Sequence, residues 1–237
     1  MAWLVAAAAV AAAAAGGHLE GRTVVLDPGH NGANGAHPDR INRQVHVGGG
    51  MYKACNTTGA ATASGYAESR FNLFVAREAA RILRRDGARV VLTRRTDHGV
   101  GPCITRRARI ANRAEADAAV SIHADGGPPG GRGFHVIRPT RIEGLTDDIH
   151  APSRRLGRLM RGAYEERTRL PRASYVGGDG LVARADLGGL RLADVPAIFV
   201  EALNLRNAVD ARRAESPRFR RRIARGIAAG VRDFLTR

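Results

Sequence analysis

Aromatic residues are scarce in this 237-residue chain, at 5% of the total, and Lys53 is its only lysine. The 38 basic residues, which outweigh 22 acidic ones to a net charge of +16, are therefore almost all arginines, and they are scattered along the chain. Few aromatics among scattered arginines exclude the aromatic and basic patches of a specific nucleic-acid reader. The positive charge still favours polyanions, such as nucleic acid, anionic lipid or an acidic wall polymer.

Only two cysteines are present, Cys55 and Cys103, and neither belongs to a C-x-x-C pair. This spacing argues against a zinc site built on cysteine. In an exported protein an even pair of cysteines predicts a disulfide, and two unrelated free thiols are the alternative.

Long apolar runs are also absent, except at the start, where residues 2–15 are almost wholly apolar and rich in alanine. The run is shorter than the roughly 20 residues of a membrane span. Its length fits the central region of a secretory signal, with Ala13 and Ala15 as the small residues before a cleavage site. We therefore expect residues 1–20 to be a signal peptide or apolar leader, residues 21–237 to be the folded domain, and the protein to be exported to the periplasm, cell wall or medium. An alanine-rich helix of the fold is the alternative.

Two histidines stand where apolar, β-prone runs end. Val24-Val25-Leu26 leads through Asp-Pro-Gly to His30, and the run from Ala118 leads to His123 and ends at Asp125. In α/β proteins the carboxyl ends of strands carry the chemistry. Taken singly, each histidine is better explained as an ordinary surface or core residue.

An acidic residue supplies a third candidate ligand. Apolar residues recur with helical spacing after Glu68 and predict a helix that Asp86-Gly87 ends. Glu68 lies near the apolar face of that helix, where a carboxylate needs a cation to offset its loss of solvation. The helix dipole is an alternative reason for an acid in the first turn. Together with His30 and His123, Glu68 makes a set typical of catalytic zinc with an open fourth position.

The last apolar run, Val195 to Val200, leads to Glu201, which we interpret as the general base at the same edge of the sheet. Three more helices are predicted over 104–115, 152–167 and 217–235, the last capped by Ser216, and further strands over 89–93 and 133–137. Residues 31–66 are expected to be irregular, and residues 181–194 are mixed in pattern. No repeat or second module is visible.

Four motifs follow one another along the chain: Asp-Pro-Gly-His, Glu-Ser-x-x-Asn, Ser-Ile-His-Ala and Val-Pro-Ala-Ile-x-Val-Glu. Their residues and their order resemble those of the zinc N-acetylmuramoyl-L-alanine amidases of the amidase-3 family. The resemblance runs from about Thr23 to Leu235. It implies a single α/β domain, with a mixed, mostly parallel sheet flanked by helices on both faces. It also implies one zinc ion per chain on His30, Glu68 and His123, with Glu201 as the catalytic carboxylate.

The implied reaction is hydrolysis of the amide between the lactyl group of N-acetylmuramic acid and L-alanine in peptidoglycan. Arg70 and Arg107 are candidates for seating the acidic stem peptide. Some family members carry an inserted helix over the zinc, but residues 31–66 lack helical periodicity, so we expect no such plug. A zinc carboxypeptidase or endopeptidase acting on the stem peptide is one alternative, and a basic, non-catalytic wall-binding protein is another. We expect a monomer whose partners are muramyl peptides, with no specific nucleic acid and no stable membrane span.

Overall fold

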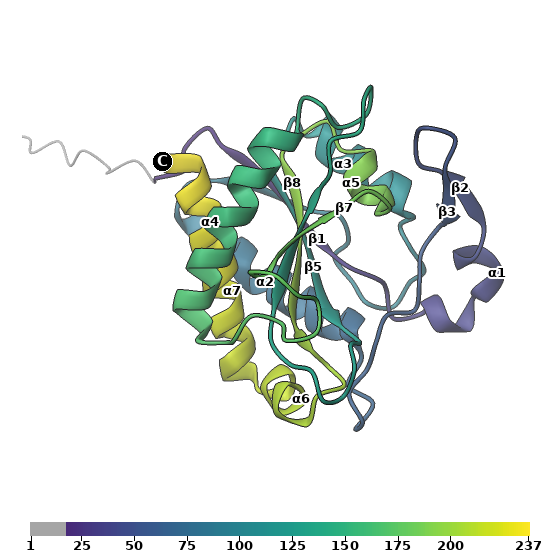
Figure 1. The fold of residues 1–237 in the computed structure, drawn as a ribbon, viewed down its shortest axis with the longest axis vertical. Coiled ribbons are helices and arrows are strands. Elements are labelled where there is room, and N and C mark those ends of the chain that lie inside the picture. Colours follow the sequence, from purple (N-terminus) through teal and green to yellow (C-terminus); the bar gives the residue numbers. More distant parts are fainter. Residues whose placement is uncertain (1–17) are drawn as a thin grey trace, which may run out of the picture.

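A six-stranded sheet forms the centre of the molecule, seen in a computed structural model that describes residues 18–237 (Figure 1). Its strand order is β4-β1-β5-β8-β6-β7. The first four strands are mutually parallel, β6 runs antiparallel to β8, and β7 is parallel to β6. The strands are β1 (Thr23–Pro28), β4 (Arg89–Leu92), β5 (Ala118–Asp125), β6 (His135–Pro139), β7 (Leu181–Arg184) and β8 (Ala197–Asn204). The predicted mixed, mostly parallel sheet is confirmed.

Helices cover both faces of this sheet, as predicted. One face is packed by α2 (Glu68–Arg85), α4 (His150–Thr168) and α7 (Pro217–Thr236), and the other by α3 (Ile104–Arg113) and the short α5 (Gly188–Arg191). Helix α6 (Ala208–Glu215) precedes α7. The sequence pattern predicted α2, α3, α4 and α7 to within a few residues of their ends. It did not predict β7, α5 or α6, because these elements are short, and Gly and charged residues interrupt their periodicity.

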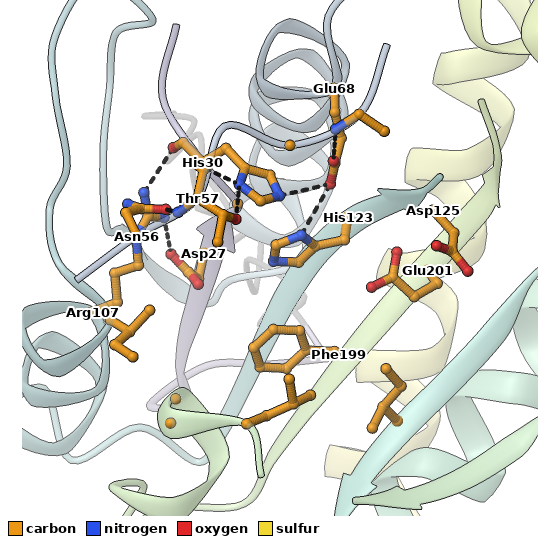
Figure 2. A pocket seen from close by; sticks show the side chains of 18 of the residues that line it. Asp27, His30, Asn56, Thr57, Glu68, Arg107, His123, Asp125, Phe199 and Glu201 are labelled. Atoms are coloured by element: carbon orange, nitrogen blue, oxygen red, sulfur yellow. Dashed lines mark hydrogen bonds and ion pairs between the residues drawn. The ribbon is translucent and has the colours of Figure 1, made fainter. Parts of the chain in front are cut away.

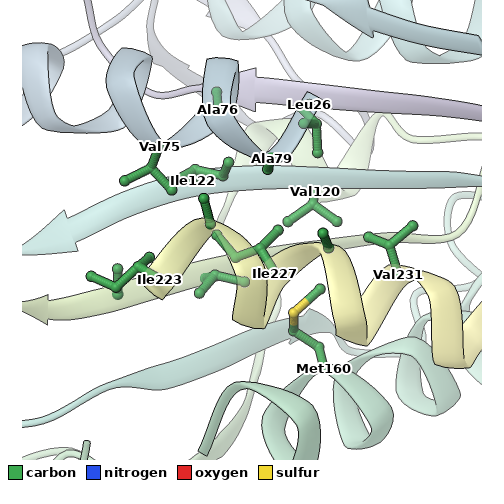
Figure 3. Close-up of a cluster of buried hydrophobic side chains, with 14 of the residues drawn as sticks. Leu26, Val75, Ala76, Ala79, Val120, Ile122, Met160, Ile223, Ile227 and Val231 are labelled. Carbon is green, nitrogen blue, oxygen red and sulfur yellow. The ribbon is translucent and has the colours of Figure 1, made fainter. Parts of the chain in front are cut away.

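The main core lies between the sheet and the layer of α2, α7 and α4. Figure 3 shows Ile223, Ile227 and Val231 of α7 directed toward the side chains of β5 and α2. The Ser216 hydroxyl accepts a hydrogen bond from the amide of Phe219 and so begins α7 where the sequence predicted. Helices α4 and α7 approach closely at Gly230. A side chain would not fit there, because its Cβ would stand 2.7 Å from the Cα of Met160.

The beginning of the described chain already belongs to this core. Leu19 is fully buried, and its amide donates to the carbonyl of Asp86. The folded domain therefore includes Leu19, two residues before the boundary expected at residue 21. Most of the expected leader, residues 1–17, lies outside the described residues. No helix within residues 18–237 is both long enough and apolar enough to cross a membrane.

Residues 31–66 are mostly irregular, as expected. Their elements are short: a 3-10 turn (Asn34–Ala36), α1 (Pro38–Ile41), and β2 (Gln44–His46) paired with β3 (Tyr52–Ala54) in a separate two-stranded sheet. The longest helix in the segment is thus the four-residue α1.

The predicted disulfide between Cys55 and Cys103 is present. It joins the end of β3 to the residue that precedes α3, and the amide of Ile104 also donates to the carbonyl of Cys55. The bond therefore anchors the irregular segment beside the carboxyl edge of the sheet.

We expect the double variant Cys55→Ser/Cys103→Ser to lose about 4 kcal/mol of unfolding free energy, because the bond closes a loop between residues 48 apart in the chain. Urea unfolding of the two proteins measures the difference. A reducing agent should destabilise the wild-type protein by a similar amount and leave the double variant unchanged. Equal unfolding midpoints for the two proteins under oxidising conditions would contradict the expectation.

Candidate metal centre

Two strands and one helix bring His30, His123 and Glu68 to one point at the carboxyl edge of the sheet (Figure 2). Glu68 Oε1 lies 3.1 Å from His30 Nε2 and 3.0 Å from His123 Nδ1, and one ligand atom from each residue lies within 4.8 Å of the others. Metal–ligand bonds of about 2 Å in a tetrahedron place neighbouring ligand atoms about 3.3 Å apart. The two-imidazole, one-carboxylate set therefore fits a zinc ion in both chemistry and spacing.

His30 is oriented by the irregular segment. Its Nδ1 lies 3.1 Å from the carbonyl oxygen of Thr57, which suits an N–H that donates to that oxygen and leaves Nε2 free for a metal. Its backbone is left-handed, with φ at 58°, directly after the turn at Gly29. Gly29 is needed there because a Cβ would stand 2.2 Å from the His123 ring.

Glu68 is held by several donors. Its Oε2 accepts from the amide of Ala60 at 2.8 Å, and its Oε1 accepts from the amide of Ala124 at 3.1 Å and from Asn72 Nδ2 at 3.2 Å. Burial alone would raise the pKa of the Glu68 carboxyl, but the charge and the hydrogen bonds of His30 and His123 hold it well below its usual value. The ionised, ligating form of Glu68 is thus favoured.

The pKa values of the two histidines shift in opposite directions. Burial lowers the pKa of His123, whose ring also stacks on Phe199 with centroids 5.0 Å apart. Burial also disfavours the charged form of His30, yet the carboxylate of Glu68 outweighs it and raises the pKa of His30. His135, on β6, is buried apart from this cluster.

Glu201 stands next to His123 rather than among the candidate ligands. The two residues are register partners on the adjacent strands β5 and β8, so their side chains leave the same face of the sheet. Figure 2 shows Glu201 and Asp125 on the opposite side of His123 from His30. Burial, followed by the neighbouring carboxylates of Glu68 and Asp125, raises the pKa of Glu201 well above its usual value.

These residues line one cleft of about 430 Å³. Besides the three candidate ligands and Glu201, its wall includes Asp125 and a charged group at Lys53, Arg184 and Asp186. Arg184 Nη2 lies 2.7 Å from Asp186, and Lys53 Nζ lies 3.6 Å from the same carboxylate. Nothing in the sequence indicated that Lys53, Arg184 and Asp186 line the cleft. For Asp125 there was an indication, because this residue ends a predicted strand and the carboxyl ends of strands meet at the site.

Arg107, a sequence candidate for substrate binding, lines the cleft but is itself only 6% exposed. Its guanidinium donates to the carbonyls of Pro28 and His30, each at 2.7 Å, and pairs with Asp27 at 2.6 Å. Arg107 therefore holds the turn that presents His30. Arg70, the other candidate, is exposed outside the cleft lining, with its guanidinium 5.8 Å from the Tyr66 ring centroid.

A second buried arginine supports the same turn. Arg94 donates to the carbonyls of Pro28 at 2.9 Å, Gly29 at 3.0 Å and Ser69 at 2.7 Å, and burial lowers its pKa to about 10. It ties the turn before His30 to the first turn of α2, where Glu68 lies. No local pattern in the sequence indicated this role for Arg94.

Asp27 supplies the negative charge that pairs with Arg107 beneath this turn. Burial would raise its pKa, but the charge of Arg107 and hydrogen bonds from Thr93 and Ser121 outweigh burial and lower the pKa from 3.8 to about 2. A carboxyl with a lowered pKa stabilises the folded protein above its usual pKa, and this stabilisation is lost as the pH falls toward the folded value.

We therefore expect Asp27 to contribute about 2 kcal/mol of unfolding free energy that disappears between about pH 4 and pH 2. In Asp27→Asn, the unfolding free energy should fall less steeply across this interval, although the variant is less stable at neutral pH because Arg107 loses its buried partner. Urea unfolding at several pH values measures the slope. Glu143→Gln, at an exposed position, should retain the wild-type slope. An unchanged slope in Asp27→Asn would contradict the assignment.

Comparison with known proteins places this site in a family. The sequence profile of the family described as N-acetylmuramoyl-L-alanine amidase matches residues 24–233. The chain is 41% identical over 218 residues to the N-acetylmuramoyl-L-alanine amidase Rv3717 of Mycobacterium tuberculosis, covering 92% of this chain and 88% of that protein.

Solved structures agree. The amidase Ami1 of Mycobacterium smegmatis superposes with a TM-score of 0.86 at 40% identity, over 92% of this chain and 98% of that one. Ami1 of Mycobacterium abscessus, in its apo form, gives a TM-score of 0.85 at 41% identity, over 91% and 99% of the two chains. The chain therefore belongs to the amidase-3 family and is an N-acetylmuramoyl-L-alanine amidase, a hydrolase that acts on peptidoglycan.

Proposed function

We propose that His30, Glu68 and His123 hold a single zinc ion and that Glu201 is the general base of the amidase reaction. The observation that carries this proposal is the convergence of two imidazoles and one ionised carboxylate, with a separate, partly buried carboxylate beside them. Zinc bound in such a set lowers the pKa of water toward about 7 and polarises a carbonyl group.

Glu201 moves the proton. Its carboxylate takes a proton from the attacking water and returns it to the nitrogen of the departing L-alanine, as the lactyl carbon–nitrogen bond breaks. Its raised pKa suits this role, because a group with a pKa nearer the working pH both accepts and returns a proton efficiently. The position of Glu201 beside His123, outside the ligand cluster, leaves its carboxylate available for the proton.

The remaining residues of the site position the candidate ligand His30 or bind the substrate. Arg94 and Arg107 hold the turn before His30, so we assign Arg107 a positioning role in place of direct substrate contact. The rim residues Lys53 and Arg184 carry the positive charge that faces the cleft, and they suit the acidic stem peptide better than Arg70, which lies outside its lining.

Metal analysis of the purified protein, paired with mass spectrometry of a digested muramyl peptide, tests the proposal. We expect one zinc per chain and release of an intact peptide that begins with L-alanine. Cleavage within the stem peptide would instead identify a carboxypeptidase or endopeptidase, and a protein that takes up no zinc and releases no product would refute the mechanism.

We also propose that the protein is exported and that residues 1–20 include the leader. The Cys55–Cys103 disulfide supports an oxidising compartment, and the wall substrate lies outside the membrane. N-terminal sequencing of the protein recovered from outside the cytoplasm, in a host that secretes it, tests the cleavage. A start at Met1 would contradict it.

A further inference from the structure

A second hollow, of about 230 Å³, lies on the outer surface of the helix layer formed by α2, α4 and α7. Six arginines and one glutamate line it, with Ile82 and Ala229 between them. Arg81 and Arg85 come from α2; Arg221, Arg225 and Arg232 come from α7; and Arg167 stands near the end of α4. We call this hollow the arginine groove.

The arginine groove is remote from the cleft. Helix α2 begins at Glu68, in the metal centre, and Arg85 is its last residue. At 1.5 Å per residue, the helix carries Arg85 about 25 Å from Glu68. In Figure 1 the outer surfaces of α4 and α7 face away from α3 and α5, which lie on the other side of the sheet. The arginine groove is therefore separate from the substrate cleft.

Helical spacing aligns the charges. Arg221 and Arg225 are four residues apart, and Arg232 follows seven residues later, so the three lie on one side of α7. Arg81 and Arg85 are likewise four residues apart on α2, which packs against α7. The residues from Arg221 to Arg232 span about 16 Å of helix, long enough for several charges of an extended polymer.

Most of this charge has no internal partner. Arg81 pairs with Glu78 at 2.9 Å, and Arg232 pairs with Asp86 at 3.1 Å. The other four, Arg85, Arg167, Arg221 and Arg225, are exposed and form no ion pair with any of residues 18–237. Guanidinium groups gathered around one hollow repel one another, and a bound polyanion would relieve this repulsion.

The lining indicates which polyanion fits. Guanidinium groups bind phosphate, like carboxylate, in a bidentate manner, and a chain of phosphodiesters offers one such anion at every repeat. No aromatic side chain lines the hollow to stack on nucleic-acid bases. Tyr52, on β3, is the single exposed large hydrophobic residue among those described, so this face presents nothing to insert into a bilayer.

We propose that the arginine groove binds a phosphodiester-linked anionic polymer of the cell wall and so retains the enzyme beside its substrate. The assignment of the polymer to the wall rests on the amidase function, whereas the binding itself needs neither the zinc ligands nor Glu201. Because these contacts are electrostatic, affinity should fall steeply with salt.

The test compares two triple variants with the same change in charge. Arg85→Gln/Arg221→Gln/Arg225→Gln removes unpaired charge from the arginine groove. Arg106→Gln/Arg109→Gln/Arg113→Gln removes three exposed arginines from α3, on the opposite face of the sheet. Arginine and glutamine have similar helix propensities, so both variants should fold. The probe is a poly(glycerol phosphate) oligomer, and calorimetry at several salt concentrations measures its affinity.

We expect the groove variant to bind the polymer about tenfold more weakly or worse. The slope of its log affinity against log salt concentration should also be shallower by about 2, because three contacts are lost. The α3 variant should stay within about threefold of the wild-type protein. Both variants should cleave a soluble muramyl peptide at the wild-type rate. Only the groove variant should act more slowly on intact walls that carry the polymer.

Equal loss of affinity in both variants would overturn the proposal, since net charge alone would then explain the binding. Tighter groove-dependent binding to phosphatidylglycerol vesicles or single-stranded DNA than to the polymer would overturn it as well. Should the groove variant unfold, Arg221→Gln against Arg109→Gln makes the same comparison. A wild-type protein that binds the polymer but leaves the soluble peptide intact would refute the proposed mechanism and not the groove.

Discussion

Replacing Glu201 with glutamine is expected to slow hydrolysis of a muramyl peptide by about 10²–10⁴-fold while leaving the bound zinc in place. Glutamine keeps the size of the side chain and removes its ability to take a proton from water. Because Glu201 lies outside the cluster of candidate ligands, the metal site should be unaffected. Steady-state turnover and metal analysis on the same preparation measure the two effects.

The unfolding free energy of Glu201→Gln distinguishes a catalytic role of Glu201 from a structural one. The raised pKa of Glu201 means that burial and the nearby Glu68 and Asp125 carboxylates oppose its ionised form in the folded protein. A neutral glutamine should therefore leave the unfolding free energy unchanged or higher. Glu166→Gln, at an exposed position on α4, is the control and should change neither activity nor stability. Wild-type turnover in Glu201→Gln would exclude Glu201 as the base.

The second large effect is expected at Glu68. Glu68→Gln should abolish activity through loss of zinc, because two neutral imidazoles remain and the anionic ligand is gone. The single carbonyl oxygen of glutamine can keep the hydrogen bond from the amide of Ala124 and loses the one from the amide of Ala60. The backbone bond from the amide of residue 68 to the carbonyl of Ala60 is unaffected, so the first turn of α2 should stay in place. The measurement is zinc content after dialysis, together with turnover before and after zinc is added back.

Chelation of the wild-type protein provides a matched comparison. The chelated wild-type protein should lose activity and regain it with zinc, whereas Glu68→Gln should not recover at the same zinc concentration. Glu78→Gln, ten residues further along α2, should keep both zinc and activity. A variant at Glu68 that retains full zinc content after dialysis would show that this carboxylate is not a ligand.

The pattern of the sequence predicted the main elements well because their apolar residues follow a regular period. In α2, three of the apolar residues that recur with helical spacing after Glu68, namely Phe71, Val75 and Leu83, are fully buried. The last strand was predicted to finish at Glu201, but β8 continues to Asn204, so Glu201 lies within the strand. Ala202 and Leu203 are as apolar as the residues before Glu201, and one charged residue in a strand does not end it.

The chemistry of the site was also readable from the sequence. Histidines after two apolar runs and a glutamate at the start of an amphipathic helix identify donor atoms and the edge of the sheet where they lie. Such signals are local, because each depends on a residue type and its immediate neighbours. The cysteine pair is similar in kind, since an even number of cysteines suggests the bond without showing what it anchors.

The local patterns of the sequence were enough to identify the candidate ligands, the candidate general base and the elements that carry them. The folded structure was needed to show that β1 and β5 are neighbours, that Arg94 and Arg107 hold the turn before His30, and that the arginines of α2 and α7 gather around one groove. The reason is physical: these contacts join residues far apart in the chain, and no local period records which strands pair or which helix faces meet.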